Sequence, residues 1–153
     1  MNILKILTDK RIKGNLGERA AAKFLKKKRY KILALNFVGN GHEIDIVARD
    51  KKNDTVAFVE VKTRSEGSVG YIESRPASAV TPEKQRSIIK ASKEFTKRMQ
   101  KNTRIRYDVI EVYLERVGSR HIVKEINHLV SAFDYNTAYD SKYFYSKRKD
   151  FNR

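Results

Sequence analysis

The sequence has no cysteine, few acidic residues and no long apolar run. Without cysteine, the chain has no disulfide scaffold, no thiolate-ligated zinc or iron–sulfur site and no cysteine nucleophile. No apolar stretch approaches the ~20 residues that a membrane-spanning helix needs. The apolar stretch within residues 1–10 is too short for a secretory signal. These absences predict a cytoplasmic protein without a membrane partner.

The charges that are present are strongly unbalanced. Lysine and arginine number 34 and aspartate and glutamate 18, which gives a net charge of +16 and a pI near 10.1. Hydrophobic residues make up 40% of the 153 residues, so the chain has the length and the core of one domain. Such a charge favours a polyanionic partner, and nucleic acid is favoured over a membrane surface.

The acidic residues are unevenly distributed along the chain. Residues 1–41 carry 11 basic and 2 acidic residues, whereas residues 42–64 carry 5 of each. One short segment therefore holds 5 of the 18 carboxylates. This concentration of acids is the strongest pointer to chemistry in the sequence.

Apolar spacing and turn residues predict an α/β protein. The expected helices cover residues 14–28 and 81–100, and the expected strands cover residues 30–37, 43–49, 55–64, 104–114 and 121–126. Thr81, Pro82 and Glu83 are typical of a helix start. Three strands joined by short turns suggest an antiparallel meander, after a first helix. The second helix then acts as a crossover to the next strand, which predicts a mixed sheet flanked by helices.

Two acids are expected to face each other across the hairpin of residues 43–64. A turn centred on residues 52–53 gives three rungs, which are Asp45–Glu60, Glu43–Lys62 and Val47–Phe58. Facing carboxylates repel, and Mg²⁺ or Mn²⁺ would offset that repulsion because such cations take hard oxygen ligands. Lys62 would position a water or stabilise charge on a phosphate. The alternative is an exposed strand in which Lys62 simply pairs with Glu43 or Glu60.

Five blocks of the sequence together match a known pattern. They are Gly14-Asn-Leu-Gly17-Glu18-Arg-Ala20-Ala, Glu43-Ile-Asp45-Ile-Val47, Phe58-Val-Glu60-Val-Lys62-Thr-Arg64, Lys84 and Arg106-Tyr-Asp108-Val109. In this order, across roughly residues 12–133, the blocks resemble the bacterial YraN family of predicted endonucleases. That family belongs to the PD-(D/E)xK nuclease superfamily and is similar to archaeal Holliday junction resolvases.

The resemblance implies a restriction-endonuclease-like α-β-β-β-α-β core in a nuclease domain of residues 1–133. It implies that Asp45 and Glu60 hold Mg²⁺ or Mn²⁺, that Val61 lends its backbone carbonyl, and that Glu18 on the first helix approaches the same site. Lys62 matches the catalytic lysine. It further implies endonucleolytic cleavage of DNA rather than RNA, in branched or single-stranded form, and a homodimer.

Further basic residues are candidate nucleic-acid contacts. They are Arg64, Lys84, Lys23 and Lys27. Lys84 fits an ordinary solvated lysine equally well. Arg106 and Asp108 fit either a structural ion pair or a pair that supports the site.

The tail of residues 134–153 interleaves aromatic and basic residues. Aromatic rings stack on bases and cations hold phosphates, so the tail is a second candidate surface for nucleic acid. The alternative is that its aromatic rings pack on the domain or on a second subunit. Two other functions remain open for the whole chain: a non-catalytic nucleic-acid-binding module with a vestigial acidic site, and a basic RNA- or ribosome-associated protein.

Overall fold

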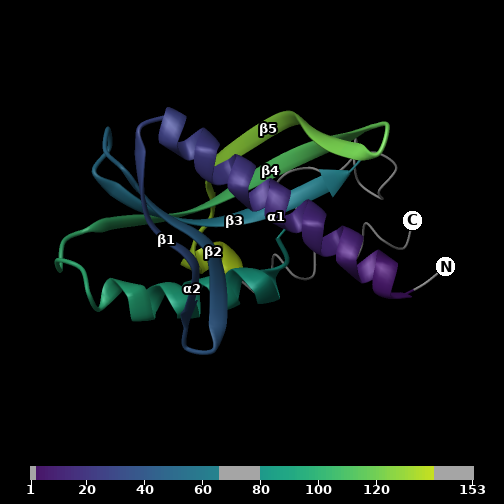
Figure 1. Ribbon diagram of the computed structural model, residues 1–153. Coiled ribbons are helices and arrows are strands. Elements are labelled where there is room, and N and C mark those ends of the chain that lie inside the picture. Colours follow the sequence, from purple (N-terminus) through teal and green to yellow (C-terminus); the bar gives the residue numbers. More distant parts are fainter. Residues whose placement is uncertain (1–2, 66–79, 140–153) are drawn as a thin grey trace, which may run out of the picture.

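The computed structural model describes residues 3–65 and 80–139, with side chains from residue 11 onward (Figure 1). The predicted order of two helices and five strands is confirmed, and a short third helix follows them. The elements are α1 (Ile3–Lys27), β1 (Tyr30–Gly39), β2 (His42–Asp50), β3 (Thr55–Ser65), α2 (Pro82–Thr96), β4 (Arg104–Val117), β5 (Arg120–Phe133) and α3 (Tyr135–Tyr139).

The strands form one five-stranded mixed sheet in the order β1-β2-β3-β4-β5. Strands β1 to β3 are an antiparallel meander, and β4 and β5 are a second antiparallel pair. Only β3 and β4 are parallel, which requires the crossover through α2. The α/β fold and the mixed sheet predicted from the sequence are therefore confirmed.

The two long helices cover opposite faces of the sheet, as Figure 1 shows. On one face, Ala21 and Leu25 of α1 pack with Ile46, Val59 and other buried side chains of the central strands. On the other face, buried residues of α2 pack around the ring of Phe58. Successive side chains of each central strand therefore point alternately into the two apolar cores.

Three element boundaries differ from the sequence prediction by four residues or more. Helix α1 begins at Ile3 rather than near residue 14, and α2 ends at Thr96 rather than near residue 100. Strand β5 continues to Phe133, seven residues beyond the predicted end. The start of α2 is as predicted, because the Thr81 side chain caps the helix.

The first residues of the aromatic tail pack on the domain. They form α3, whose Ala138 carbonyl accepts a hydrogen bond of 2.9 Å from Arg86 Nη1 on α2. The rings of Tyr135 and Tyr139 stack on each other and face Lys93 and Arg86, respectively. For these two tyrosines the packing alternative is confirmed. The rest of the tail and residues 66–79 lie outside the described residues. No helix in the described part of the chain is long and apolar enough to cross a membrane.

Candidate active site

The site lies where β2 and β3 separate. The predicted rung between Val47 and Phe58 is confirmed, and the ladder continues to Ile46–Val59. Beyond that rung, Asp45 Oδ2 accepts a hydrogen bond of 2.7 Å from the Val61 backbone N–H. The predicted rungs Asp45–Glu60 and Glu43–Lys62 are therefore wrong for the described strands, because the ladder has ended and the Asp45 side chain bridges to β3 instead.

Glu60 is a buried carboxylate with two lysines around it. Glu60 is 4% exposed, and Lys62 Nζ lies 3.3 Å from its Oε1. Among the described residues, Oε2 is buried and has no hydrogen-bond partner, and Lys84 Nζ lies 3.7 Å from it. Burial first, and then the charge of Asp45, raise the pKa of Glu60 to about 7 against the opposing effect of both lysines. The predicted alternative of an exposed strand is wrong at Glu60, although Lys62 does pair with this residue.

The first turn of α2 delivers Lys84 to the carboxylate. Thr81 adopts an extended conformation at the N-cap, and its hydroxyl accepts a hydrogen bond of 3.2 Å from the Lys84 backbone N–H. Because the cap orients this turn, the Lys84 side chain reaches Glu60. Lys84 is therefore paired with a buried carboxylate while its side chain is still 37% exposed, and its contact with phosphate stays a prediction.

Glu18 approaches from the other layer through a close helix–strand contact. A side chain at Gly17 would place its Cβ 1.9 Å from Thr63 Oγ1, so only glycine lets α1 lie this close to β3. The next residue, Glu18, then faces the acids of β2. Burial and the charges of Asp45 and Glu43 raise the pKa of Glu18.

Asp45 and Glu60 suit a hard divalent cation. Glu60 offers a buried oxygen without a hydrogen bond, and the Asp45 charge beside it destabilises the ionised pair. Within residues 3–65 and 80–139, no group of three or more histidine and acidic side chains is arranged to hold a metal ion. Mg²⁺ characteristically takes one or two carboxylates and completes its shell with waters and phosphate oxygens, so a two-carboxylate site fits it.

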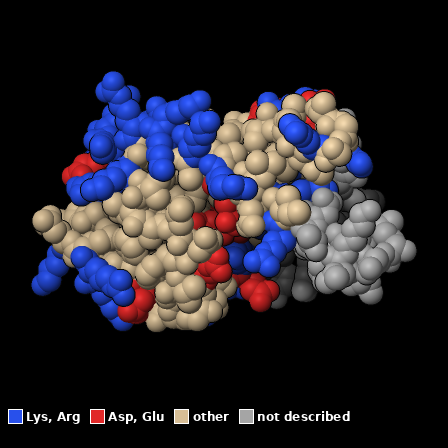
Figure 2. Space-filling model, in the orientation of Figure 1, with Lys and Arg blue, Asp and Glu red and all other residues tan. Residues whose placement is uncertain are grey.

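A pocket of about 610 Å³ opens beside this site, between α1 and β1. Its walls are Asn15, Glu18, Arg19, Ala22, Lys23, Lys26, Leu35, Asn36 and Asp45. Figure 2 shows acidic side chains near the middle of this face and basic side chains at the upper left, where α1 ends. Lys23 is part of the pocket, whereas Lys27 is exposed and does not line it. Reasoning from the sequence missed Arg19, Leu35 and Asn36.

A second buried carboxylate, Glu111, was also missed. It lies on β4 directly opposite Lys62 and is fully buried. The Tyr113 hydroxyl donates a hydrogen bond of 2.7 Å to its Oε2, and burial and this contact raise the pKa of Tyr113 to about 12. The signal in the sequence that could have indicated Glu111 was an acid within the otherwise apolar residues 109–112. Arg64, opposite Tyr113, is half-buried, and among the described residues its Nε has no hydrogen-bond partner.

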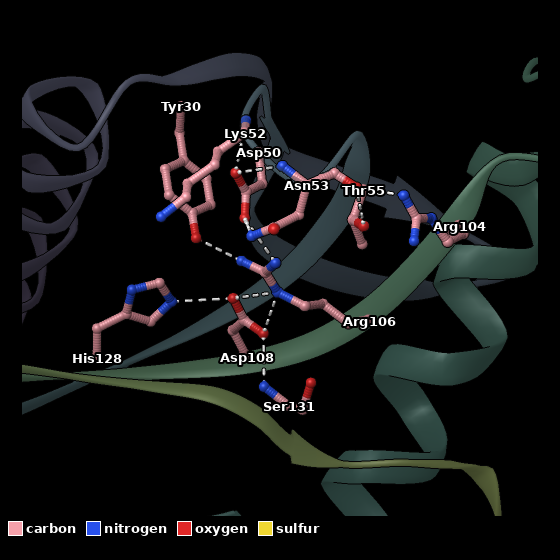
Figure 3. A network of polar contacts seen from close by, with 10 residues as sticks. All are labelled: Tyr30, Asp50, Lys52, Asn53, Thr55, Arg104, Arg106, Asp108, His128 and Ser131. Carbon is pink, nitrogen blue, oxygen red and sulfur yellow. Dashed lines mark hydrogen bonds and ion pairs between the residues drawn. The ribbon is translucent and has the colours of Figure 1, made fainter.

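Arg106 and Asp108 belong to a separate polar network (Figure 3). Arg106 bonds to Asp108, to Asp50 at 2.8 Å and to the Tyr30 hydroxyl. Asp108 also pairs with His128 Nε2 at 2.9 Å. Hydrogen bonds from Arg106 and from the Asn53 backbone and side chain outweigh burial and hold the pKa of Asp50 well below its usual range. The network ties β1, β2, β4 and β5 together. Arg106 and Asp108 therefore form a structural ion pair, which is one of the two predicted alternatives.

The chain is similar to curated bacterial proteins along most of its length. The family described as "Uncharacterised protein family UPF0102" matches residues 17–112. A UPF0102 protein of Acetivibrio thermocellus is 41% identical over 127 residues, which are 82% of this chain and 93% of that protein. A UPF0102 protein of Clostridioides difficile is 43% identical over 122 residues, or 79% of this chain and 96% of the relative.

A third relative, a UPF0102 protein of Pelobacter propionicus, is 43% identical over 82% of this chain and 85% of its own length. The matched residues 17–112 contain Glu18, Asp45, Glu60, Lys62 and Lys84. They also contain β2 and β3, the two strands that separate at the site. By family match and by these relatives, the chain belongs to the UPF0102 family.

Proposed function

We propose that this protein is a metal-dependent endonuclease of the PD-(D/E)xK type that hydrolyses phosphodiester bonds in DNA. The observation that carries the proposal is the buried Glu60, which has Asp45 beside it and the ammonium groups of Lys62 and Lys84 on its two oxygens. A second acid beside a buried carboxylate does not stabilise it when the role is only structural. Two carboxylates that bind a cation together need to lie side by side.

Asp45 and Glu60 would hold the cation, with the Val61 carbonyl as a further oxygen donor, and Glu18 would face the site from α1. When bound, Mg²⁺ or Mn²⁺ supplies charge that polarises the phosphodiester and lowers the pKa of water. The Val61 N–H fixes one Asp45 oxygen, so the orientation of that carboxylate is set before any ligand arrives. Such preorganisation reduces the reorganisation that the reaction requires.

Lys62 and Lys84 would act on the phosphate and on the attacking water. With Glu60 engaged by a cation, both ammonium groups would be free to contact the substrate. Lys62, whose side chain is 30% exposed, would orient the water that attacks phosphorus. The water oxygen would form the new bond to phosphorus and lose a proton to solvent, while the bond to the leaving oxygen breaks and that oxygen takes a proton from solvent. Lys84 stabilises charge on the phosphate oxygens.

The basic surface of α1 would gather the polyanion. Lys26 and Lys27 lie in its last turn, and Arg19, Lys23 and Lys26 line the pocket that leads to Asp45. Neutralising several phosphates releases counterions, so binding falls steeply as salt rises. This dependence applies to the binding step and is separate from the chemistry at the carboxylates.

The test is cleavage of a labelled branched or flapped DNA in Mg²⁺ or Mn²⁺ by purified protein. Asp45→Asn and Lys62→Ala should lower the rate at least about 100-fold, while both variants retain DNA binding. Lys97→Ala is the matched control, because Lys97 forms a surface pair with Glu94 on α2. Binding without cleavage by the wild type on every DNA structure would overturn the proposal.

A non-catalytic nucleic-acid-binding module is the second candidate. One observation favours it, since Lys62 and Lys84 already balance the charge of Glu60 without a cation. In that case, Asp45→Asn would leave DNA binding and its dependence on divalent cations unchanged. Preference for structured RNA over DNA in the same assay would instead support an RNA-associated protein.

A further inference from the structure

The pocket between α1 and β1 is lined by side chains of both charges. Arg19, Lys23 and Lys26 of α1 are cationic, whereas Glu18 of the same helix and Asp45 of β2 are acidic. Its volume of about 610 Å³ falls within the range of small-molecule sites. A pocket of this size accepts one or two nucleotides but not a base-paired double helix.

An apolar side chain and two amides complete the lining. Leu35 of β1 is 56% exposed, lines the pocket beside Ala22, and so offers apolar surface to a flat ring. Asn15 and Asn36 also line it, and amide side chains both donate and accept hydrogen bonds. Apolar contact with amide groups around it suits the face and the edge of a nucleobase.

The backbone of β1 is adapted at this position. Asn36 has a positive φ of 49°, a conformation that asparagine tolerates better than most residues. It falls between the rungs Leu35–Ile46 and Phe37–Ile44, opposite Asp45. Left-handed residues inside a strand are uncommon and are concentrated at functional sites. Here the distortion coincides with the pocket and the acidic site.

Asp45 connects the pocket to the proposed chemistry. It lines the pocket, and its charge acts on Glu60. A strand whose phosphate is held through a cation on Asp45 and Glu60 would therefore have its neighbouring nucleoside within reach of Leu35 and Asn36. A nucleoside that is still base-paired cannot enter, because its partner strand would have to enter as well.

We infer that this pocket binds one unpaired nucleoside next to the phosphate held at Asp45 and Glu60, so that the protein selects DNA with unpaired nucleotides. The base contacts Leu35 and Ala22, the amides of Asn15 and Asn36 bond its edge, and Arg19 and Lys23 contact the adjoining phosphates. This inference rests on the proposed nuclease function for the position of the phosphate, but the preference it predicts is a property of binding alone.

The experiment measures binding in Ca²⁺, a hard cation that also takes oxygen ligands, and a gel of the same samples confirms that the DNA stays intact. A fluorescein-labelled duplex with a short single-stranded flap is compared with the same duplex without the flap by fluorescence anisotropy. The wild type should bind the flapped DNA about tenfold more tightly, as expected for one well-seated base. Leu35→Ala and Asn36→Gly should each bring this ratio close to one.

The matched control is Leu33→Ala, because Leu33 lies on the same strand, is 38% exposed and does not line the pocket. Glycine at position 36 retains the left-handed backbone, and Leu35 is outside both buried cores, so these variants should fold. An equal affinity of the wild type for both DNAs overturns the inference. So does a preference that survives in Leu35→Ala and Asn36→Gly.

Cleavage assays in Mn²⁺ separate this inference from the proposed function. Loss of the flap preference in the pocket variants alone supports the pocket, even where the wild type cleaves nothing and the nuclease proposal fails. Cleavage by the wild type without a flap preference in binding supports the nuclease and overturns the pocket.

Discussion

The carboxylate of Asp45 accepts a 2.7 Å hydrogen bond from the Val61 backbone at the point where β2 and β3 separate. One side chain therefore ends the β-ladder and fixes its own orientation in the site. The other Asp45 interactions are electrostatic and involve Glu18 and Glu60. Substitutions at Asp45 can therefore separate the effect of its hydrogen bond from the effect of its charge.

Asp45→Asn should retain the fold, because an amide oxygen still accepts the Val61 N–H and the repulsion of Glu60 is removed. Asp45→Ala leaves that N–H without its acceptor, which costs about 1–3 kcal/mol. Urea unfolding of both variants measures the difference. Equal loss of stability in the two variants would contradict the role assigned to the hydrogen bond.

Glu60→Gln should stabilise the metal-free protein at pH 8. The pKa of Glu60 is raised to about 7 from an ordinary 4.5, so the folded protein binds this proton more tightly than the unfolded chain does. Its favourable contribution is complete below about pH 4.5 and is lost as the pH rises through 7. The variant avoids that loss, which is on the order of 2 kcal/mol.

The measurement is urea unfolding in EDTA at pH 4.5 and pH 8. The variant should match the wild type at the lower pH and exceed it at the higher pH. Glu94→Gln is the control, since that glutamate forms a surface pair worth at most about 1 kcal/mol. Added Mn²⁺ should stabilise the wild type and leave the variant unchanged, because ligand binding to the folded state alone raises stability. A wild type that exceeds the variant at pH 8 in EDTA would refute this account.

Asp108→Asn should destabilise the protein at neutral pH by on the order of 3 kcal/mol, because it breaks a buried network around Arg106. Hydrogen bonds from His128 and Arg106 outweigh burial and lower the pKa of Asp108. Its contribution is therefore present above the ordinary value of 3.8 and is lost as the pH falls through the lowered value. Thermal unfolding at pH 7 and at pH 3 should show the variant and the wild type converging in acid.

Gly17→Ala should destabilise the protein by about 1–3 kcal/mol, because the new methyl group overlaps Thr63. Gly14→Ala is the matched control in the same helix. Apart from its chain neighbours and the adjacent helix backbone, no atom of the described residues lies within 4 Å of its added Cβ, so it should stabilise by about 0.5–1 kcal/mol, the ordinary gain for a helix interior. Equal effects of the two substitutions in chemical denaturation would show that α1 does not pack against β3 as described.

The central elements were predictable because their burial follows a simple period. Strands β2 and β3 carry apolar residues on both faces, and Thr81 with Pro82 marks the start of α2. Strand β5 was predicted too short because it is an edge strand, with exposed Ile122, Val123 and Val130 and no clean alternation. The helix α3 was missed because its cap, in which Asp134 and Thr137 bond each other's backbone N–H, lies in a segment dominated by aromatic residues.

The acids and Lys62 were predictable from the sequence, but their surroundings were not. Local pattern indicated which carboxylates share a hairpin. It did not indicate that the ladder ends at Ile46–Val59, since that depends on the Asp45 side chain. The pocket residues Leu35 and Asn36 look unremarkable in sequence, because the α1 wall that completes the pocket is remote in the chain.

The parallel pairing of β3 with β4 also has a consequence for the order of folding. The meander of β1 to β3 contains Asp45, Glu60 and Lys62 and forms through short turns, whereas β4 joins it only after the chain closes a long loop. Such non-local closure is the slow event in folding. Before it, Glu60 is hydrated and costs nothing to ionise. Docking of β4 and α2 then buries Glu60 and delivers Lys84 in one late step, so the candidate site should be among the last parts of the protein to assemble.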